Sequence, residues 1–264
     1  MSNRIKNIFE KKGKKLITFT TGGDPDLDTS LEILNTIINN GIDIIEIGMP
    51  FSDPMADGPT IQDSSVRSIE NGTKINDIFK IVSKVRKLND EIPVILMGYY
   101  NSVFNLGIDN FTSKCTEVGV DGLIIVDLQP EEDSELYIKT KEKNIDLIRL
   151  ITPTTNVNRL NTILKNASGF LYYVTITGIT GQNSANLKHL KKSIKIIKSS
   201  TKLPIVAGFG IKNRKDVEDI SVFTNGVVIG SSIVNIIKNN LRDKNKMLTE
   251  IDAFTKDLKK GIKE

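Results

Sequence analysis

Two carboxylic acids are the residues best suited to transfer protons. Glu46 lies near the end of the apolar run at 43–47. Burying an unpaired carboxylate is costly, so a glutamate at this position suggests a functional role. Asp57 follows in the proline-rich loop 50–59, and two carboxyls whose surroundings separate their pKa values can act as acid and base. A structural ion pair for Glu46 and a turn or helix cap for Asp57 remain the alternatives. Asp53 precedes a proline, which is typical of a turn, and is the weaker candidate.

Glycines follow the last two apolar runs of the chain. They occur in 208–210 and at Gly230, where Ser231 and Ser232 precede an expected helix at 233–239. Free backbone N–H groups and a helix N-terminus can bind a phosphate dianion, and barrel enzymes use these two loops for that purpose. Tight turns with a serine N-cap are the alternative. Because glycines occur at both places, phosphate binding is favoured.

Threonines and glycines also dominate the segment 175–183. Such a segment could close over a bound ligand and exclude water, or it could be a plain loop. Just before it, Tyr172 and Tyr173 are neighbours on an apolar run, so one faces the inside of the sheet and the other faces the helices. Parity alone does not say which.

The residue types that are absent or rare in the sequence limit the possible catalytic mechanisms. No expected strand ends in a lysine, which disfavours Schiff-base chemistry. The chain has one histidine, His189, and one cysteine, Cys115, so a Ser-His-Asp triad cannot be built and a His/Cys metal site is nearly excluded. Catalysis must therefore rest on carboxylates, hydroxyls and backbone groups, with no metal.

Eight short apolar runs, each followed by a helical pattern, must position these groups. They lie at 16–20, 43–47, 94–97, 122–126, 147–151, 170–174, 205–207 and 226–229. Helices with clear end signals are expected between them, for example at 28–40 and 77–88. Runs that do not alternate with polar residues are typical of parallel strands covered on both faces, in a closed barrel or a doubly wound sheet. Eight strands in 264 residues fit a (β/α)8 TIM barrel, whose active site lies at the strand C-termini. Extra helices at 2–12 and 246–260 would plug or buttress it.

Composition and charge exclude several classes of protein. No long linker divides the chain, which favours one domain over 1–264. The net charge of +4 comes from lysines scattered over helical patterns without interleaved aromatics, so we expect no nucleic-acid partner. No apolar run of membrane-spanning length or signal peptide is present, and a single cysteine fits a reducing compartment. A cytoplasmic enzyme is expected.

Five motifs together resemble those of tryptophan synthase alpha subunits. They are IEIGMPFSDPMADG at 45–58, LMGYYN at 96–101, TGITG at 177–181, PIVAGFGI at 204–211 and GVVIGS at 226–231. The resemblance is collinear over about 8–252, essentially the whole chain. It implies a TIM-barrel lyase (EC 4.2.1.20) of tryptophan biosynthesis, which cleaves indole-3-glycerol phosphate to indole and glyceraldehyde 3-phosphate.

The resemblance also assigns roles to residues of this chain. It makes Glu46 and Asp57 the catalytic carboxylates, Tyr172 the tyrosine beside the glutamate, and Thr180 the lid residue that meets Asp57. The phosphate would lie on Gly181, Gly210, Gly230 and Ser231, and the indole pocket would be lined by Phe19, Met97, Tyr99, Ile124 and Phe209.

Partners and cofactors follow from the same resemblance. The implied partner is a beta subunit in an alpha2beta2 tetramer, with pyridoxal phosphate on that subunit and no cofactor on this chain. Many family members have a proline where this chain has Gln129, in a loop that borders the beta subunit in the family. The alternatives are another phosphate-binding barrel enzyme, such as a sugar-phosphate isomerase, and a non-catalytic activator that only docks to a partner.

Overall fold

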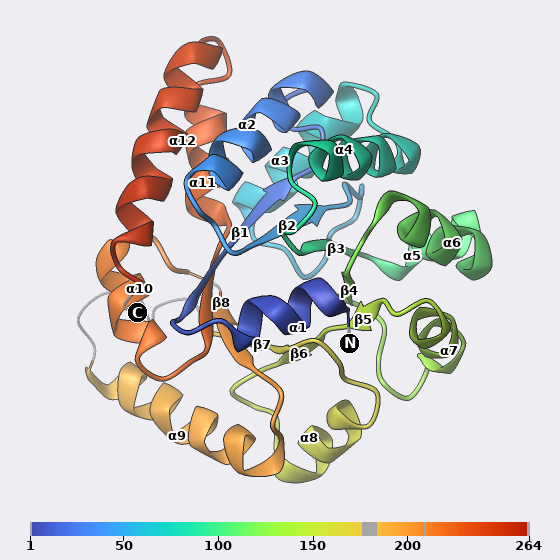
Figure 1. Ribbon diagram of the computed structural model, residues 1–264, viewed down its shortest axis with the longest axis vertical. Helices are drawn as coiled ribbons and strands as arrows, with labels where there is room; N and C mark the ends of the chain where they lie inside the picture. Colours follow the sequence, from blue (N-terminus) through green and yellow to red (C-terminus); the bar gives the residue numbers. More distant parts are fainter. Residues whose placement is uncertain (1, 176–183, 209, 263–264) are drawn as a thin grey trace.

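The computed structural model describes residues 2–175, 184–208 and 210–262, and shows a ring of strands surrounded by helices (Figure 1). The strands are β1 (Lys15–Thr21), β2 (Ile44–Gly48), β3 (Val94–Gly98), β4 (Gly122–Ile125), β5 (Asp146–Leu147), β6 (Arg149–Ile151), β7 (Leu171–Val174), β8 (Ile205–Gly208) and β9 (Gly226–Ile229). The helices are α1 (Asn3–Glu10), α2 (Leu27–Asn39), α3 (Pro59–Glu70), α4 (Ile75–Leu88), α5 (Tyr100–Leu106), α6 (Ile108–Val118), α7 (Ser134–Glu142), α8 (Val157–Leu164), α9 (Ser184–Ser200), α10 (Arg214–Ser221), α11 (Ser231–Asn239) and α12 (Lys244–Lys259).

All strand pairs are parallel, in the order β5-β4-β3-β2-β1-β9-β8-β7-β6. The two ends of this order, β5 and β6, are separated only by Ile148, whose N–H donates to the carbonyl of Leu123 at 2.9 Å. The sheet therefore closes, and the predicted TIM barrel is confirmed. The single strand expected at 147–151 is split in two, because its first part pairs with β4 and its second part with β7.

Side chains alternate between two cores. The interior of the barrel is filled by a cluster that includes Ile44, Ile148 and Tyr172, whereas the shell between strands and helices contains Ile45, Leu147 and Tyr173. This alternation follows from the two-residue period of a strand. Tyr172 is therefore the tyrosine that faces inward, and Tyr173 faces the helices.

The extra terminal helices have different positions. Helix α1 closes the interior from the strand N-termini, because Ile5 is fully buried in the interior cluster and Phe9 packs on Phe170 with ring centroids 5.6 Å apart. Helix α12 packs outside the barrel against α2, with Ile251 and Leu258 in the outer core (Figure 1). Within the described residues, no helix is long and apolar enough to cross a membrane.

Candidate active site

Glu46 occupies the middle of β2 and points into the barrel. Its side chain is fully buried, and neither carboxylate oxygen has a hydrogen-bond partner among the described residues. Phe19 is its register partner on β1. Because burial disfavours the charged form, the pKa of Glu46 rises from 4.5 to about 8. At neutral pH the group is mostly a neutral acid with a proton to give.

Asp57 lies in the loop between β2 and α3 and has a different environment. The Tyr99 hydroxyl donates to its Oδ2 at 3.0 Å, and the Ala56 N–H donates to the same hydroxyl at 3.0 Å. Burial raises the pKa of Asp57, while the hydrogen bond from Tyr99 opposes that rise. Tyr99 also stacks on Phe51 at 5.2 Å. Asp57 thus receives the hydrogen-bond donor that Glu46 lacks.

Helix α3, which begins two residues after Asp57, is fixed to the end of β1. Arg67 donates two hydrogen bonds to the buried Asp24, at 2.8 and 2.7 Å, and the Ser68 hydroxyl donates to the Gly22 carbonyl at 2.7 Å. A two-pronged guanidinium–carboxylate pair gives both strength and orientation. These contacts limit how far the C-terminal end of the Asp57 loop can move.

Tyr172 reaches from β7 toward the two carboxyls. A Cβ atom at Gly208 would lie 2.1 Å from its hydroxyl oxygen, so the adjacent strand needs a glycine there. Burial raises the Tyr172 pKa well above 10, and the nearby charges of Glu46 and Asp57 raise it further. The phenol therefore stays protonated and can donate a hydrogen bond.

The glycines after β8 and β9 meet the carboxyls in one small cavity of about 50 Å³. Helix α11 begins here, with Gly230 as its N-cap, so its free N–H groups and the positive end of its dipole face this space. The residues around it are Phe19, Glu46, Asp57, Ile61, Met97, Tyr172, Gly210, Ile211, Val228, Gly230 and Ser231. The structure thus brings together most of the predicted catalytic and phosphate-binding residues. Thr180, Gly181 and Phe209 lie outside the described residues.

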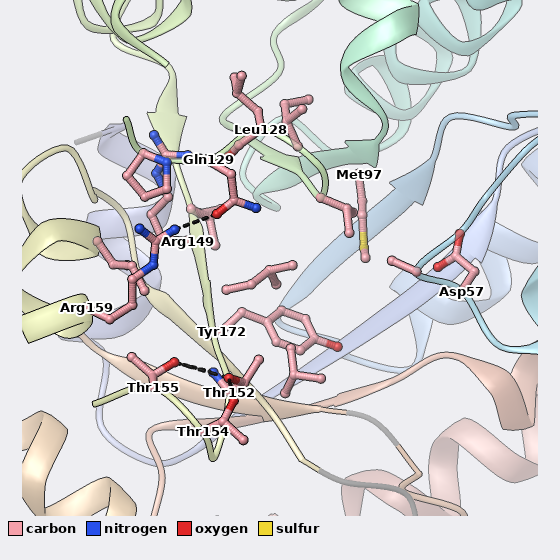
Figure 2. Close-up of a pocket in the computed structure, with 18 residues that line it drawn as sticks. Asp57, Met97, Leu128, Gln129, Arg149, Thr152, Thr154, Thr155, Arg159 and Tyr172 are labelled. Atoms are coloured by element: carbon pink, nitrogen blue, oxygen red, sulfur yellow. Dashed lines mark hydrogen bonds between the residues drawn. The ribbon is translucent and has the colours of Figure 1, made fainter. Parts of the chain in front are cut away.

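A second and larger cavity, of about 460 Å³, adjoins the first and shares Asp57, Met97 and Tyr172 with it. Its inner wall is apolar and comes from interior positions of neighbouring strands (Figure 2). Two further predicted lining residues lie near these cavities. Ile124 is fully buried one layer deeper, below Val126. Tyr99 donates to Asp57 and lines a third, very small cavity with Phe19, Asp57 and Met97.

Sequence reasoning missed several residues of the larger cavity. Val126, Ile148 and Leu150 belong to its apolar part. Two of them could have been predicted from the two-residue period of a strand. Val126 lies two residues after Ile124, on the same face of its strand, and Leu150 is the register partner of the inward-facing Tyr172. The polar residues Gln129 and Arg159 come from segments outside the strands, where no spacing rule indicated them.

The fold and this site define a (β/α)8-barrel enzyme in which a glutamate of β2 and an aspartate of the following loop share one cavity. A family model described as Tryptophan synthase alpha chain matches residues 5–263, and the chain belongs to this family. It is accordingly a lyase, EC 4.2.1.20, that functions in tryptophan biosynthesis. The recognition made from the motifs is confirmed.

Known relatives match over nearly their full length. Tryptophan synthase alpha chains of Petrotoga mobilis and Zymomonas mobilis are each 42% identical, covering 97% and 99% of this chain and 99% and 97% of their own sequences. A crystal structure of tryptophan synthase subunit alpha from Legionella pneumophila has a TM-score of 0.90 at 33% identity, covering 99% of this chain and 98% of that one. An aminoacrylate-bound tryptophan synthase structure from M. tuberculosis has a TM-score of 0.87 at 26% identity, covering 98% and 99%.

Proposed function

We propose that this chain performs a retro-aldol cleavage of indole-3-glycerol phosphate, with Glu46 and Asp57 as its acid-base pair. The observation that carries the proposal is the small cavity in which a neutral buried glutamic acid, a half-buried aspartate and a helix N-terminus meet. These are an acid, a hydrogen-bond acceptor and an anion site, and the substrate presents a basic ring carbon, an indole N–H and a phosphate. The whole chain, 1–264, would act as one domain.

Glu46 supplies the proton that makes indole a leaving group. Indole leaves poorly as a carbanion, so C3 must first accept a proton, and the neutral carboxyl of Glu46 is the acid for this step. The resulting carboxylate then accepts the proton of the side-chain hydroxyl as that carbon becomes a carbonyl and the carbon–carbon bond breaks. Glu46 ends the cycle protonated, so one group serves both steps.

Asp57 stabilises the charge that develops on the ring. Protonation at C3 makes the indole nitrogen cationic, and a carboxylate that accepts its N–H favours this state. The Tyr99 hydroxyl holds Oδ2, so Oδ1 is left for the ligand. In this proposal Thr180 meets Asp57 when the segment after β7 closes, and Tyr172 is the third catalytic residue, beside Glu46.

The phosphate is proposed to lie on Gly181, Gly210, Gly230 and Ser231. The N-terminus of α11 supports this placement, because free N–H groups and the helix dipole favour a dianion there. The indole ring would then extend from Phe19 past Met97 into the larger cavity, with Phe209 as a further wall. Each end of the substrate thus meets groups of matching polarity.

A beta subunit is the proposed partner, in an alpha2beta2 tetramer, and pyridoxal phosphate would belong to that subunit and not to this chain. Two large apolar side chains support a docking surface at the strand C-termini. Met55, in the loop after β2, is 83% exposed, and Phe104, in α5 after β3, is 68% exposed. Both residues lie on segments that follow strand C-termini, the side of the barrel that carries the active site. A cytoplasmic location stays a prediction.

The test is to mix the purified chain with indole-3-glycerol phosphate and to measure indole by chromatography. Release of indole that depends on Glu46 is expected. A sugar-phosphate isomerase would release none, and a non-catalytic activator would be unaffected by Glu46→Gln, so either result would refute the proposal.

A further inference from the structure

The larger cavity is longer than its apolar part. Met97, Val126, Leu150 and Tyr172 form one end, beside Asp57, and the loops after β4 and β6 supply a polar end. Figure 2 shows Asp57 on one side, Met97 and Tyr172 between, and Gln129 with Arg159 on the opposite side. An indole ring laid against Met97 and Tyr172 would therefore direct the edge of its six-membered ring toward the polar end.

The polar end holds hydrogen-bond donors on exposed and half-buried side chains. Arg159 donates to the Gln129 side-chain oxygen and also pairs with Glu131. Because a guanidinium can only donate, this bond fixes Oε1 toward the arginine and turns the Gln129 amide N–H2 group away from it. No hydrogen bond from that N–H2 group occurs within the described part of the chain. The Thr152 and Thr154 hydroxyls, which lie 2.9 Å apart, line the same cavity.

A buried ion pair supports the loop that carries Gln129. Arg149, 5% exposed, pairs with Asp133, 1% exposed, and also donates to the Leu128 carbonyl at 3.4 Å. Asn166 donates to the other oxygen of Asp133 at 2.8 Å. These contacts hold the backbone on both sides of Gln129, so its side chain extends into the cavity lining from a well-supported loop.

The hydrogen-bonding groups of the lining indicate the kind of ligand that fits. Among the described residues that line the cavity, Arg149 and Arg159 are cationic, and Asp57 at the far end is the acid. Glu131 and Asp133 pair with the arginines but do not line the space. Because the positive charge of each arginine is balanced by its acid, the selection comes from the hydrogen-bond donors of this end, which suit a carboxylate because a carboxylate only accepts hydrogen bonds.

We propose that this polar end is a subsite for a carboxylate carried on the six-membered ring of an indole, so that the enzyme accepts ring-carboxylated indole-3-glycerol phosphates as well as the plain substrate. The inference rests on the proposed function, which places the ring against Met97 and Tyr172. It assigns Gln129 and Arg159 to recognition of the substituent.

Direct binding to the full chain tests the proposal without turnover. Isothermal calorimetry would compare indole-5-carboxylate and indole-6-carboxylate with 5-methylindole and 6-methylindole at the same pH and salt. At least one carboxylate is expected to bind about tenfold more tightly than its methyl analogue, which is the scale of one charge-assisted hydrogen bond at a partly exposed site. The ratio should fall toward one in both Arg159→Gln and Gln129→Leu.

Arg242→Gln is the matched control, because it removes the same charge from an exposed position after α11 and should leave the ratio unchanged. Equal binding of carboxylates and methyl analogues would overturn the subsite, as would a preference that survives both substitutions. Failure of the chain to cleave plain substrate would instead count against the proposed function, since the binding ratio needs no cleavage.

Discussion

Replacing Glu46 by Gln should change how the stability of the protein depends on pH. The substitution keeps the shape of the side chain and removes its ionisable group. In the folded protein the pKa of Glu46 is about 8, against 4.5 for an exposed glutamate. Between these two pH values the folded state holds a proton that the unfolded state has released. The stability that comes from the neutral form is therefore lost as pH rises through this window and is fully lost above about 8.

The size of the effect follows from the pKa difference. Each pH unit within the window lowers the free energy of unfolding by about 1.4 kcal/mol, so the loss approaches ~5 kcal/mol by pH 9. Glu46→Gln escapes this loss. Its free energy of unfolding should stay near that of the parent at pH 5 and exceed it by roughly 3–5 kcal/mol at pH 9, which corresponds to a Tm gain on the order of 10 °C for a chain of this size.

Urea and thermal unfolding of both proteins at pH 5 to 9, at constant ionic strength, would measure the difference. Glu70→Gln, at the exposed end of α3, is the control, because it makes the same chemical change at a solvated position. If the free energies of unfolding of Glu46→Gln and the parent protein differ by a constant amount over this pH range, Glu46 does not titrate as argued. Its role as the neutral acid would then be refuted.

Four further predictions concern activity. Glu46→Gln and Asp57→Asn should each lower kcat for indole release at least ~100-fold, with Glu46→Gln more severe because no acid remains for C3; near-normal turnover of a folded variant would exclude the two-carboxylate mechanism. Gly230→Asp should raise KM through charge repulsion of the phosphate while circular dichroism shows the fold intact; an unchanged KM would remove the phosphate assignment. Tyr99→Phe removes the hydrogen bond that lowers the Asp57 pKa, so kcat should fall about tenfold and the acid limb of the pH–rate profile should move to higher pH; an unmoved limb would contradict this. A saturating beta subunit should raise indole release by ordering loops at the strand C-termini, as rate measurement and sizing of the mixture would show; absence of a complex would refute the partner.

Much of the fold could be predicted from the sequence, because apolar runs followed by helical patterns dictate parallel strands covered on both faces. The exception was the strand at 147–151, whose split depends on which neighbour each half pairs with, and pairing is not local information. The inward direction of Tyr172 likewise needed the register of β7 with its neighbours. The resemblance predicted Tyr99 as a residue of the indole pocket, but the sequence did not indicate its contact with Asp57, which comes from a different loop.

The two carboxyls differ because of where the chain places them. An inward-facing residue in the middle of a barrel strand is surrounded by interior side chains. The backbone N–H groups around it are already used in hydrogen bonds between strands. Glu46 therefore has no hydrogen-bond donor within the described structure. A residue on a loop above the barrel can be met by a hydroxyl and by solvent, as Asp57 is by Tyr99. The first position favours the neutral acid, whereas at the second the hydrogen bond from Tyr99 offsets part of the rise in pKa that burial causes. A barrel that must hold one proton donor and one carboxylate within a single cavity can thus obtain both from one β-strand and the loop that follows it, without a metal or a histidine to separate their pKa values.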